Sequence, residues 1–140
     1  MVFLCFSVKD RLPLVNDFYH FLSNFGVDIW YDRRNIYIGD NRINTNINEG
    51  AKSPDIKYAI LFYSDNFVNG NICLDEYEIL KQRYYKGEIS LFPVFLNCIP
   101  DEVNDEFKLF KKLVFKLVKN QSDFNSLALH IITSYFCDNM

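Results

Sequence analysis

The residues best suited to chemistry in this chain of 140 residues are a thiol and a carboxylate three positions apart, in the run Cys73-Leu74-Asp75-Glu76. The sequence predicts a helix over residues 73–84 that ends at Gly87, so Glu76 should lie in its first turn and face solvent. The positive end of the helix dipole favours an ionised carboxylate there. Such a group either stabilises its own turn, as Asp75 also could, or offers negative charge to a ligand.

Neither the thiols nor the imidazoles form a pattern typical of a metal site or of a thiol nucleophile. The cysteines include no Cys-x-x-Cys pair, and the histidines do not adjoin them. A nucleophilic thiol needs a base to activate it, and no histidine stands near Cys73 in the sequence. We therefore expect no metal site, and a packed thiol at the start of a helix. The residues concerned are Cys5, Cys73, Cys98, Cys137, His20 and His130.

Five short apolar runs predict buried β-strands, because each is too short for a helix. They are residues 2–6, 27–31, 58–62, 89–95 and 113–118. Helices are predicted between these runs and after the last, over residues 12–25, 43–51, 73–84 and 123–136. Strands that alternate with helices form a parallel sheet through right-handed crossovers. The predicted fold is α/β and flavodoxin-like: a doubly wound, five-stranded parallel sheet in the order 2-1-3-4-5, with helices on both faces.

Two further expectations follow from a sheet that is covered on both faces. Strand residues such as Trp30, Ile60, Phe62 and Leu91 should be buried. Pro93 cannot donate to a sheet ladder, so the fourth strand should lie near an edge or carry a bulge.

Ligands of such sheets bind beyond the carboxyl ends of the strands. That crevice is made here by residues 7–10, 32–40 and 63–71.

Composition predicts one domain, over residues 1–140, with ample material for a core. Apolar residues make up 49% of the chain and aromatic residues 17%, which argues against disorder. The net charge is −3 and no long Lys/Arg run occurs, so nucleic acid and anionic membranes are not expected partners. No apolar run has the length of a membrane span, and the first strand begins directly after Met1. We expect a cytoplasmic protein with free thiols.

Four segments follow one another along the chain: residues 2–7 with Asp10, residues 26–32 with Ile36, Gly39 and Asp40, residues 60–64 with Asn66 and Phe67, and residues 73–76. In this order they resemble the TIR (Toll/interleukin-1 receptor) domain family over essentially the whole chain. The resemblance identifies residues 32–40 as the family's long BB loop, and Cys73-Leu74-Asp75-Glu76 as the Cys-x-x-Glu that carries its catalytic glutamate. One departure precedes that motif, because many relatives have Ser-x-Trp-Cys where this chain has Gly70-Asn71-Ile72-Cys73.

The resemblance implies that the chain cleaves NAD+ at the nicotinamide–ribose bond, giving nicotinamide and ADP-ribose or a cyclic ADP-ribose isomer. NAD+ is then the substrate, and no cofactor is implied. Departure of neutral nicotinamide leaves an oxocarbenium-like ribose, which one carboxylate can stabilise while it orients the ribose hydroxyls. Glu76 takes that catalytic role, whereas Glu78 should point to another side of the helix. The implied substrate-binding residues are Phe6, Ser7, Val8, Tyr37, Gly39 and Cys73.

The resemblance also implies partners and a setting: self-association of TIR domains through the BB loop, a possible effector domain or partner protein, and bacterial antiphage defence. A non-catalytic TIR–TIR interaction module remains the alternative. A phosphoacceptor receiver domain is disfavoured, because it needs acidic residues where this chain has Ser7-Val8-Lys9 and Tyr63-Ser64. A dinucleotide-binding Rossmann enzyme is disfavoured as well, since no Gly-x-Gly-x-x-Gly follows the first strand.

Overall fold

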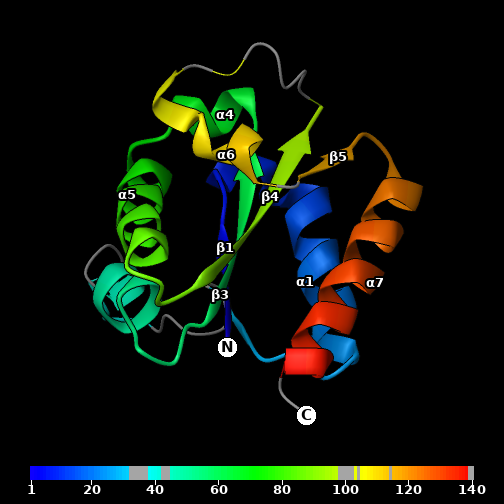
Figure 1. Cartoon of the computed structure of the whole chain (residues 1–140), viewed down its shortest axis with the longest axis horizontal. Coiled ribbons are helices and arrows are strands. Elements are labelled where there is room, and N and C mark those ends of the chain that lie inside the picture. Colours follow the sequence, from blue (N-terminus) through cyan, green and yellow to red (C-terminus); the bar gives the residue numbers. More distant parts are fainter. Residues whose placement is uncertain (32–37, 42–44, 98–102, 104, 114, 139–140) are drawn as a thin grey trace.

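Five parallel strands form one sheet in the order β2-β1-β3-β4-β5, as the sequence predicts (Figure 1). The structure is a computed structural model and describes residues 1–31, 38–41, 45–97, 103, 105–113 and 115–138. The strands are β1 (Val2–Cys5), β2 (Ile29–Trp30), β3 (Tyr58–Tyr63), β4 (Ser90–Leu96) and β5 (Lys116–Val118). The helices and short turns are η1 (Val8–Asp10), η2 (Arg11–Val15), α1 (Asn16–Asn24), η3 (Asn46–Ala51), α4 (Asp65–Val68), α5 (Asn71–Tyr85), η5 (Asp105–Phe107), α6 (Leu109–Lys112) and α7 (Gln121–Asp138).

Strand side chains alternate between two hydrophobic cores, one on each face of the sheet. Val2 and Leu4 of β1 pack with α1 and α7, whereas Phe3 and Cys5 pack with α4, α5 and α6. Figure 1 shows these two helical layers on opposite sides of β1, β3 and β4. The expected strand residues are buried in these cores, namely Trp30, Ile60, Phe62 and Leu91.

The first helix begins later than the predicted residue 12. Leu12 has an extended backbone, with φ −111° and ψ 134°, because a residue that precedes proline is disfavoured in the α region. The chain therefore passes through η1 and the kinked segment η2 before α1 begins at Asn16. The second strand is also shorter than predicted, since only Ile29 and Trp30 pair with β1.

Pro93 lies near an edge of the sheet, as expected, because β4 is next to the edge strand β5 and pairs with β3 on its other side. Pairing with β3 runs from Ser90 to Phe95, but pairing with β5 begins only at Val94. Pro93 thus lies just before the ladder to β5, which explains why a proline is tolerated in an interior strand. The strand β5 itself starts at Lys116 rather than at residue 113.

Helix α5 positions the start of the predicted catalytic motif and differs from the prediction at its N-terminus. It begins at Asn71 rather than at Cys73, with Gly70 as the N-cap residue. At its C-terminus Gly87 has φ 76°, and the amides of Gly87 and Glu88 bond back to the carbonyls of Tyr84 and Arg83.

None of the helices within the described residues combines the length and apolar character needed to span a bilayer.

Candidate active site

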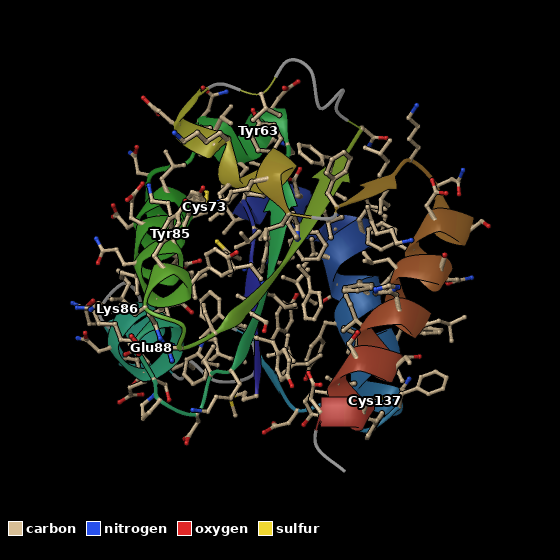
Figure 2. The ribbon with its side chains drawn as sticks, in the orientation of Figure 1. Tyr63, Cys73, Tyr85, Lys86, Glu88 and Cys137 are labelled. Carbon is tan, nitrogen blue, oxygen red and sulfur yellow. The ribbon has the colours of Figure 1, made fainter. Side chains whose placement is uncertain are left out.

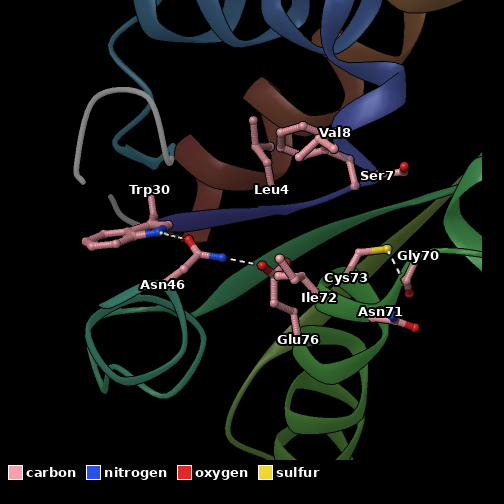
Figure 3. Close-up of a pocket in the computed structure, with 11 residues that line it drawn as sticks. Leu4, Ser7, Val8, Trp30, Asn46, Gly70, Asn71, Ile72, Cys73 and Glu76 are labelled. Atoms are coloured by element: carbon pink, nitrogen blue, oxygen red, sulfur yellow. Dashed lines mark hydrogen bonds between the residues drawn. The ribbon is translucent and has the colours of Figure 1, made fainter. Parts of the chain in front are cut away.

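A cavity of about 300 Å³ opens at the carboxyl ends of β1 and β2, against the N-terminal half of α5. This is the end of the sheet where ligands of doubly wound folds bind, and the volume is at the lower end of the range for ligand sites. Figure 3 shows side chains from β1, β2, η3 and α5 converging on it. Its lining consists of Leu4, Phe6, Ser7, Val8, Trp30, Asn46, Gly70, Asn71, Ile72, Cys73 and Glu76.

Glu76 lines this cavity but lies deeper than the sequence predicts. Because α5 begins at Asn71, Glu76 falls in its second turn, where the helix dipole acts weakly. Its exposed fraction is 5%, so the expectation of a solvent-facing carboxylate is wrong. Removing this side chain therefore affects stability, because a buried partner loses its acceptor at a typical cost of about 1–3 kcal/mol.

That buried partner is Asn46, on η3. Its side-chain Nδ2 donates a hydrogen bond to Glu76 Oε1. Its Oδ1 accepts a hydrogen bond of 2.9 Å from the indole Nε1 of Trp30, and the three side chains form a continuous chain across the cavity wall (Figure 3). Sequence reasoning treated Trp30 as a core residue and did not single out Asn46, since no motif marks a contact between residues so far apart.

Cys73 is a packed thiol at the start of α5, as the sequence predicts. Its Sγ donates to the carbonyl oxygen of Phe67 at 3.4 Å and lies 3.6 Å from that of Gly70. Burial, and secondarily the charge of Glu76, raises the pKa of this thiol from 9.0 to about 11. A protonated thiol is a poor nucleophile, which fits a packed thiol that lines the cavity.

The absence of a side chain at Gly70 allows that packing. A Cβ built at Gly70 would lie 2.7 Å from Cys73 Sγ, which is too close for any residue but glycine without a shift. Asn71 and Ile72 then turn into the helix and line the cavity. The sequence resemblance implies a tryptophan at the position of Ile72, but here an aliphatic side chain forms this part of the wall.

The polar exit of β1 is tied to the exit of β3. Asp10 accepts hydrogen bonds from Ser64 Oγ and from Asn66 Nδ2, the latter at 2.8 Å. Ser64 also caps α4 through the amide of Phe67. The neighbouring Ser7 caps η1 by accepting from the amide of Lys9 at 3.3 Å. These bonds fix the rim of the cavity on which Val8, 52% exposed, stands.

The structure thus brings together five of the predicted site residues and leaves Gly39 apart. Phe6, Ser7, Val8, Cys73 and Glu76 all line the cavity. Gly39 is exposed with φ 99°, and a Cβ built there would meet nothing within 4 Å. Tyr37 lies outside the described residues, and so does most of the predicted BB loop. The part of the chain that is described contains no group of three His, Cys, Asp or Glu side chains suited to a metal ion.

A family model for the TIR domain matches residues 2–129. Among curated proteins, the 2' cyclic ADP-D-ribose synthase BtTIR of Bacteroides thetaiotaomicron is 29% identical over 122 residues, which is 86% of this chain and 40% of that protein. The NAD(+) hydrolase TcpC of Escherichia coli is 28% identical over 103 residues, 73% of this chain and 33% of that protein. The chain therefore spans well under half the length of these relatives.

Solved structures agree on the fold. The TIR domains of the activated Roq1 resistosome superpose with a TM-score of 0.68 at 18% identity, covering 99% of this chain and 98% of theirs. The TIR domain of the Toll-related receptor TRR-2 from Hydra magnipapillata gives a TM-score of 0.67 at 17% identity, covering 94% and 97%. With the family match over residues 2–129, the sheet order and the Cys-x-x-Glu at the cavity, the chain belongs to the TIR domain family.

Proposed function

We propose that this chain is an NAD+ glycohydrolase that cleaves the nicotinamide–ribose bond and uses NAD+ as its substrate without a further cofactor. The observation that carries the proposal is the carboxylate of Glu76, which lines the cavity at the carboxyl ends of the strands and is held there by Asn46. Two family relatives that bear the names 2' cyclic ADP-D-ribose synthase and NAD(+) hydrolase support it.

The chemistry requires one well-placed negative charge. The bond between the ribose C1′ and the pyridinium nitrogen breaks, and its electron pair neutralises the nicotinamide that leaves. The ribose then carries oxocarbenium-like positive charge, which Glu76 offsets while it orients the ribose hydroxyls. No acid is needed for the leaving group, because it departs as a neutral molecule. One carboxylate therefore suffices.

The surroundings of Glu76 suit this role. Leu4, Phe6 and Ile72 contribute apolar surface to the cavity, and a fixed charge acts more strongly on a developing cation when water is excluded. Ser7 and Val8 at the rim are the proposed contacts for the rest of the dinucleotide. Water that adds at C1′ releases one proton to solvent and gives ADP-ribose. A hydroxyl of the same molecule that attacks C1′ releases its proton in the same way and gives a cyclic isomer.

The setting we propose is bacterial antiphage defence in the cytoplasm, with a possible effector domain or partner protein that responds to the product. Self-association through the BB loop belongs to the same proposal. At the described end of that loop, Ile38 is fully exposed and Gly39 follows with a positive φ. A single exposed isoleucine does not by itself mark an interface, so this association is proposed from the family alone. A module limited to contacts between TIR domains is the second candidate function.

One experiment separates the two candidates. The purified chain is incubated with NAD+ at high protein concentration, free nicotinamide is quantified by chromatography, and the second product is identified by mass spectrometry. Nicotinamide released together with ADP-ribose or its cyclic isomer is the expected result. An unchanged amount of NAD+ at this high protein concentration would contradict the enzymatic proposal and favour the interaction module.

A further inference from the structure

The bond between Trp30 and Asn46 determines which end of the Asn46 amide faces Glu76. An indole N–H can only donate a hydrogen bond, so the group that meets Trp30 Nε1 at 2.9 Å must be the amide oxygen. The amide nitrogen of Asn46 then points to Glu76, where it donates to Oε1. A carboxylate can only accept, so all three groups are matched in this one orientation.

The packing of η3 holds Asn46 in this position. Asn46 and Gly50 are four residues apart and both are buried, so they share one face of the segment. A Cβ at Gly50 would lie 2.7 Å from Trp30 Nε1 and 2.9 Å from Phe3 Cε2. The missing side chain therefore lets η3 approach the indole closely enough for Asn46 to reach its N–H.

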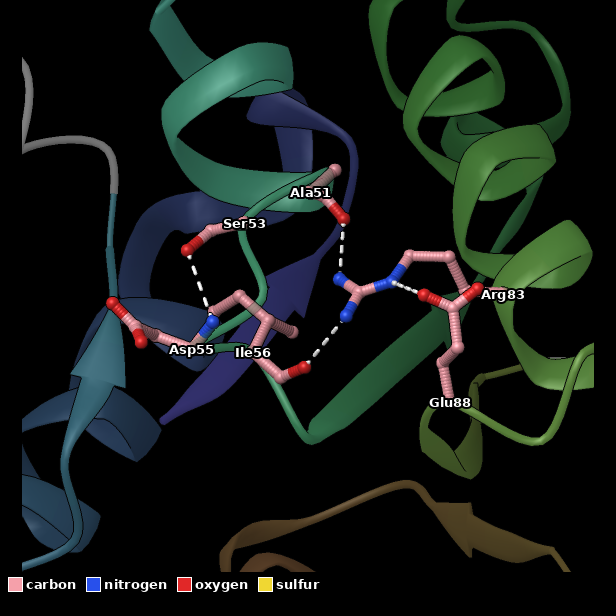
Figure 4. Close-up of polar contacts among 6 residues, drawn as sticks. All are labelled: Ala51, Ser53, Asp55, Ile56, Arg83 and Glu88. Carbon is pink, nitrogen blue, oxygen red and sulfur yellow. Dashed lines mark hydrogen bonds and ion pairs between the residues drawn. The ribbon is translucent and has the colours of Figure 1, made fainter.

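Helix α5 holds the other end of η3 through Arg83. The guanidinium donates to the carbonyl oxygens of Ala51 at 2.8 Å and Ile56 at 2.9 Å, and its Nε lies 3.6 Å from Glu88 (Figure 4). Arg83 is 8% exposed, so these bonds are shielded from water. The backbone around Asn46 is thereby fixed to the same helix that carries Glu76.

The direction of the Asn46 amide matters because all three side chains of this hydrogen-bonded chain are buried. The exposed fractions are 8% for Trp30, 8% for Asn46 and 5% for Glu76. Buried polar groups that lose their partners are costly, and those with matched partners are held rigidly. A donor held in one direction also fixes where the Glu76 carboxylate lies in the cavity wall.

We propose that Asn46 is a positioning residue for Glu76, and that Trp30 acts through Asn46 by fixing the direction of its amide. The inference rests on the proposed NAD+ cleavage and assigns to Asn46 and Trp30 a role in the rate of that reaction rather than in substrate affinity. The effect should therefore appear in kcat, with KM nearly unchanged.

Four variants test the inference by steady-state nicotinamide release, together with thermal unfolding. Asn46→Leu removes the donor and should lower kcat by about 10- to 100-fold. Asn46→Asp keeps an acceptor for Trp30 but offers Glu76 no N–H while ionised. Its kcat should fall as much as that of Asn46→Leu. Trp30→Phe keeps the ring without the indole donor and should lower kcat several-fold. The double variant Trp30→Phe/Asn46→Leu should be no slower than Asn46→Leu alone, because residues that act in series are not additive.

Tyr31→Phe is the matched control. Tyr31 follows Trp30 directly but faces the other core, and its hydroxyl donates to Asn16 Oδ1 at 2.8 Å. This variant also removes one donor from a ring and should keep the parental kcat. Folded Asn46 variants with parental kcat, alongside an inactive Glu76→Gln, would overturn the positioning role alone. Activity of Asn46→Asp equal to that of the parent would reduce Asn46 to a structural support for Trp30. A parent that releases no nicotinamide would overturn both proposals.

Discussion

Glu76 and Arg83 stand seven residues apart on α5, two helical turns, and both reach across to η3. Glu76 bonds to the side chain of Asn46 at the start of η3, and Arg83 bonds to the backbone carbonyl of Ala51 at its end. One helix thus supplies the proposed catalytic carboxylate and also fixes the segment that orients it.

Replacing Arg83 by methionine should destabilise the fold. The carbonyl oxygens of Ala51 and Ile56 would lose charged donors in a buried setting, at an expected cost of about 2–4 kcal/mol in the free energy of unfolding. Urea denaturation of the variant and the parent measures this difference. Lys86→Met is the control, because Lys86 is exposed just beyond the end of the same helix (Figure 2), and it should change stability by less than about 1 kcal/mol. Equal losses for the two variants would show that Arg83 has no special role.

Stability should fall in alkaline solution, partly through Cys73. Burial raises the pKa of its thiol from 9.0 to about 11, so the folded state keeps a proton that the unfolded state releases. Where the unfolded state binds fewer protons, the free energy of unfolding decreases as pH rises. The contribution of Cys73 is present in full below pH 9 and is lost as pH approaches 11.

Urea denaturation between pH 7 and pH 11 should therefore show a shallower alkaline decline for Cys73→Ala than for the parent. Cys137→Ala is the control, because Cys137 is exposed near the end of α7, away from Cys73 (Figure 2). It should leave the parental pH dependence intact. If the free energy of unfolding declined with pH equally steeply in the parent and in Cys73→Ala, the assignment of the raised pKa to this thiol would be contradicted.

Self-association through the BB loop predicts that specific activity rises with protein concentration. Gly39 has φ 99° with open space around its Cβ position, so a β-branched residue there would suffer backbone strain without a clash. Gly39→Val should lower specific activity while the thermal midpoint changes little. Gly39→Asn should lose less, since asparagine tolerates a positive φ better than valine does. Specific activity that stays constant over a wide dilution series would count against a shared site.

The sheet was largely predictable because a strand buried on both faces is a continuous apolar run. Residues 58–62 and 89–95 correspond to β3 and β4 with a difference of one residue at their ends. The run 113–118 was less informative, since Leu113 is the C-cap of α6 and only Lys116–Val118 pair with β4. Apolar character alone does not distinguish the end of a helix from the start of a strand.

The candidate site was predictable only where a local motif marks it. Glu76 and Cys73 belong to one short motif, and Phe6, Ser7 and Val8 lie at the end of one strand, so the resemblance to the TIR family could identify them as candidates. Trp30 and Asn46 meet through the packing of η3 on β2. A helix was predicted over residues 43–51, and the buried side of η3 contains Asn46 and Gly50 as well as Ala51. No single-sequence pattern reports a hydrogen bond that depends on tertiary packing.

The most direct test of the account compares Glu76→Gln with Glu78→Gln. Glutamine keeps the shape of the side chain and an oxygen that can accept from Asn46, but it removes the charge that should stabilise the ribose cation. We expect kcat for nicotinamide release to fall by roughly 10² or more, with little change in KM, because the ground-state ribose carries no such charge. Glu78 is 57% exposed and pairs with Lys81 at 2.9 Å on the outer side of α5, so Glu78→Gln should retain most of the activity. A folded Glu76→Gln variant that releases nicotinamide from NAD+ at the parental rate would contradict the account.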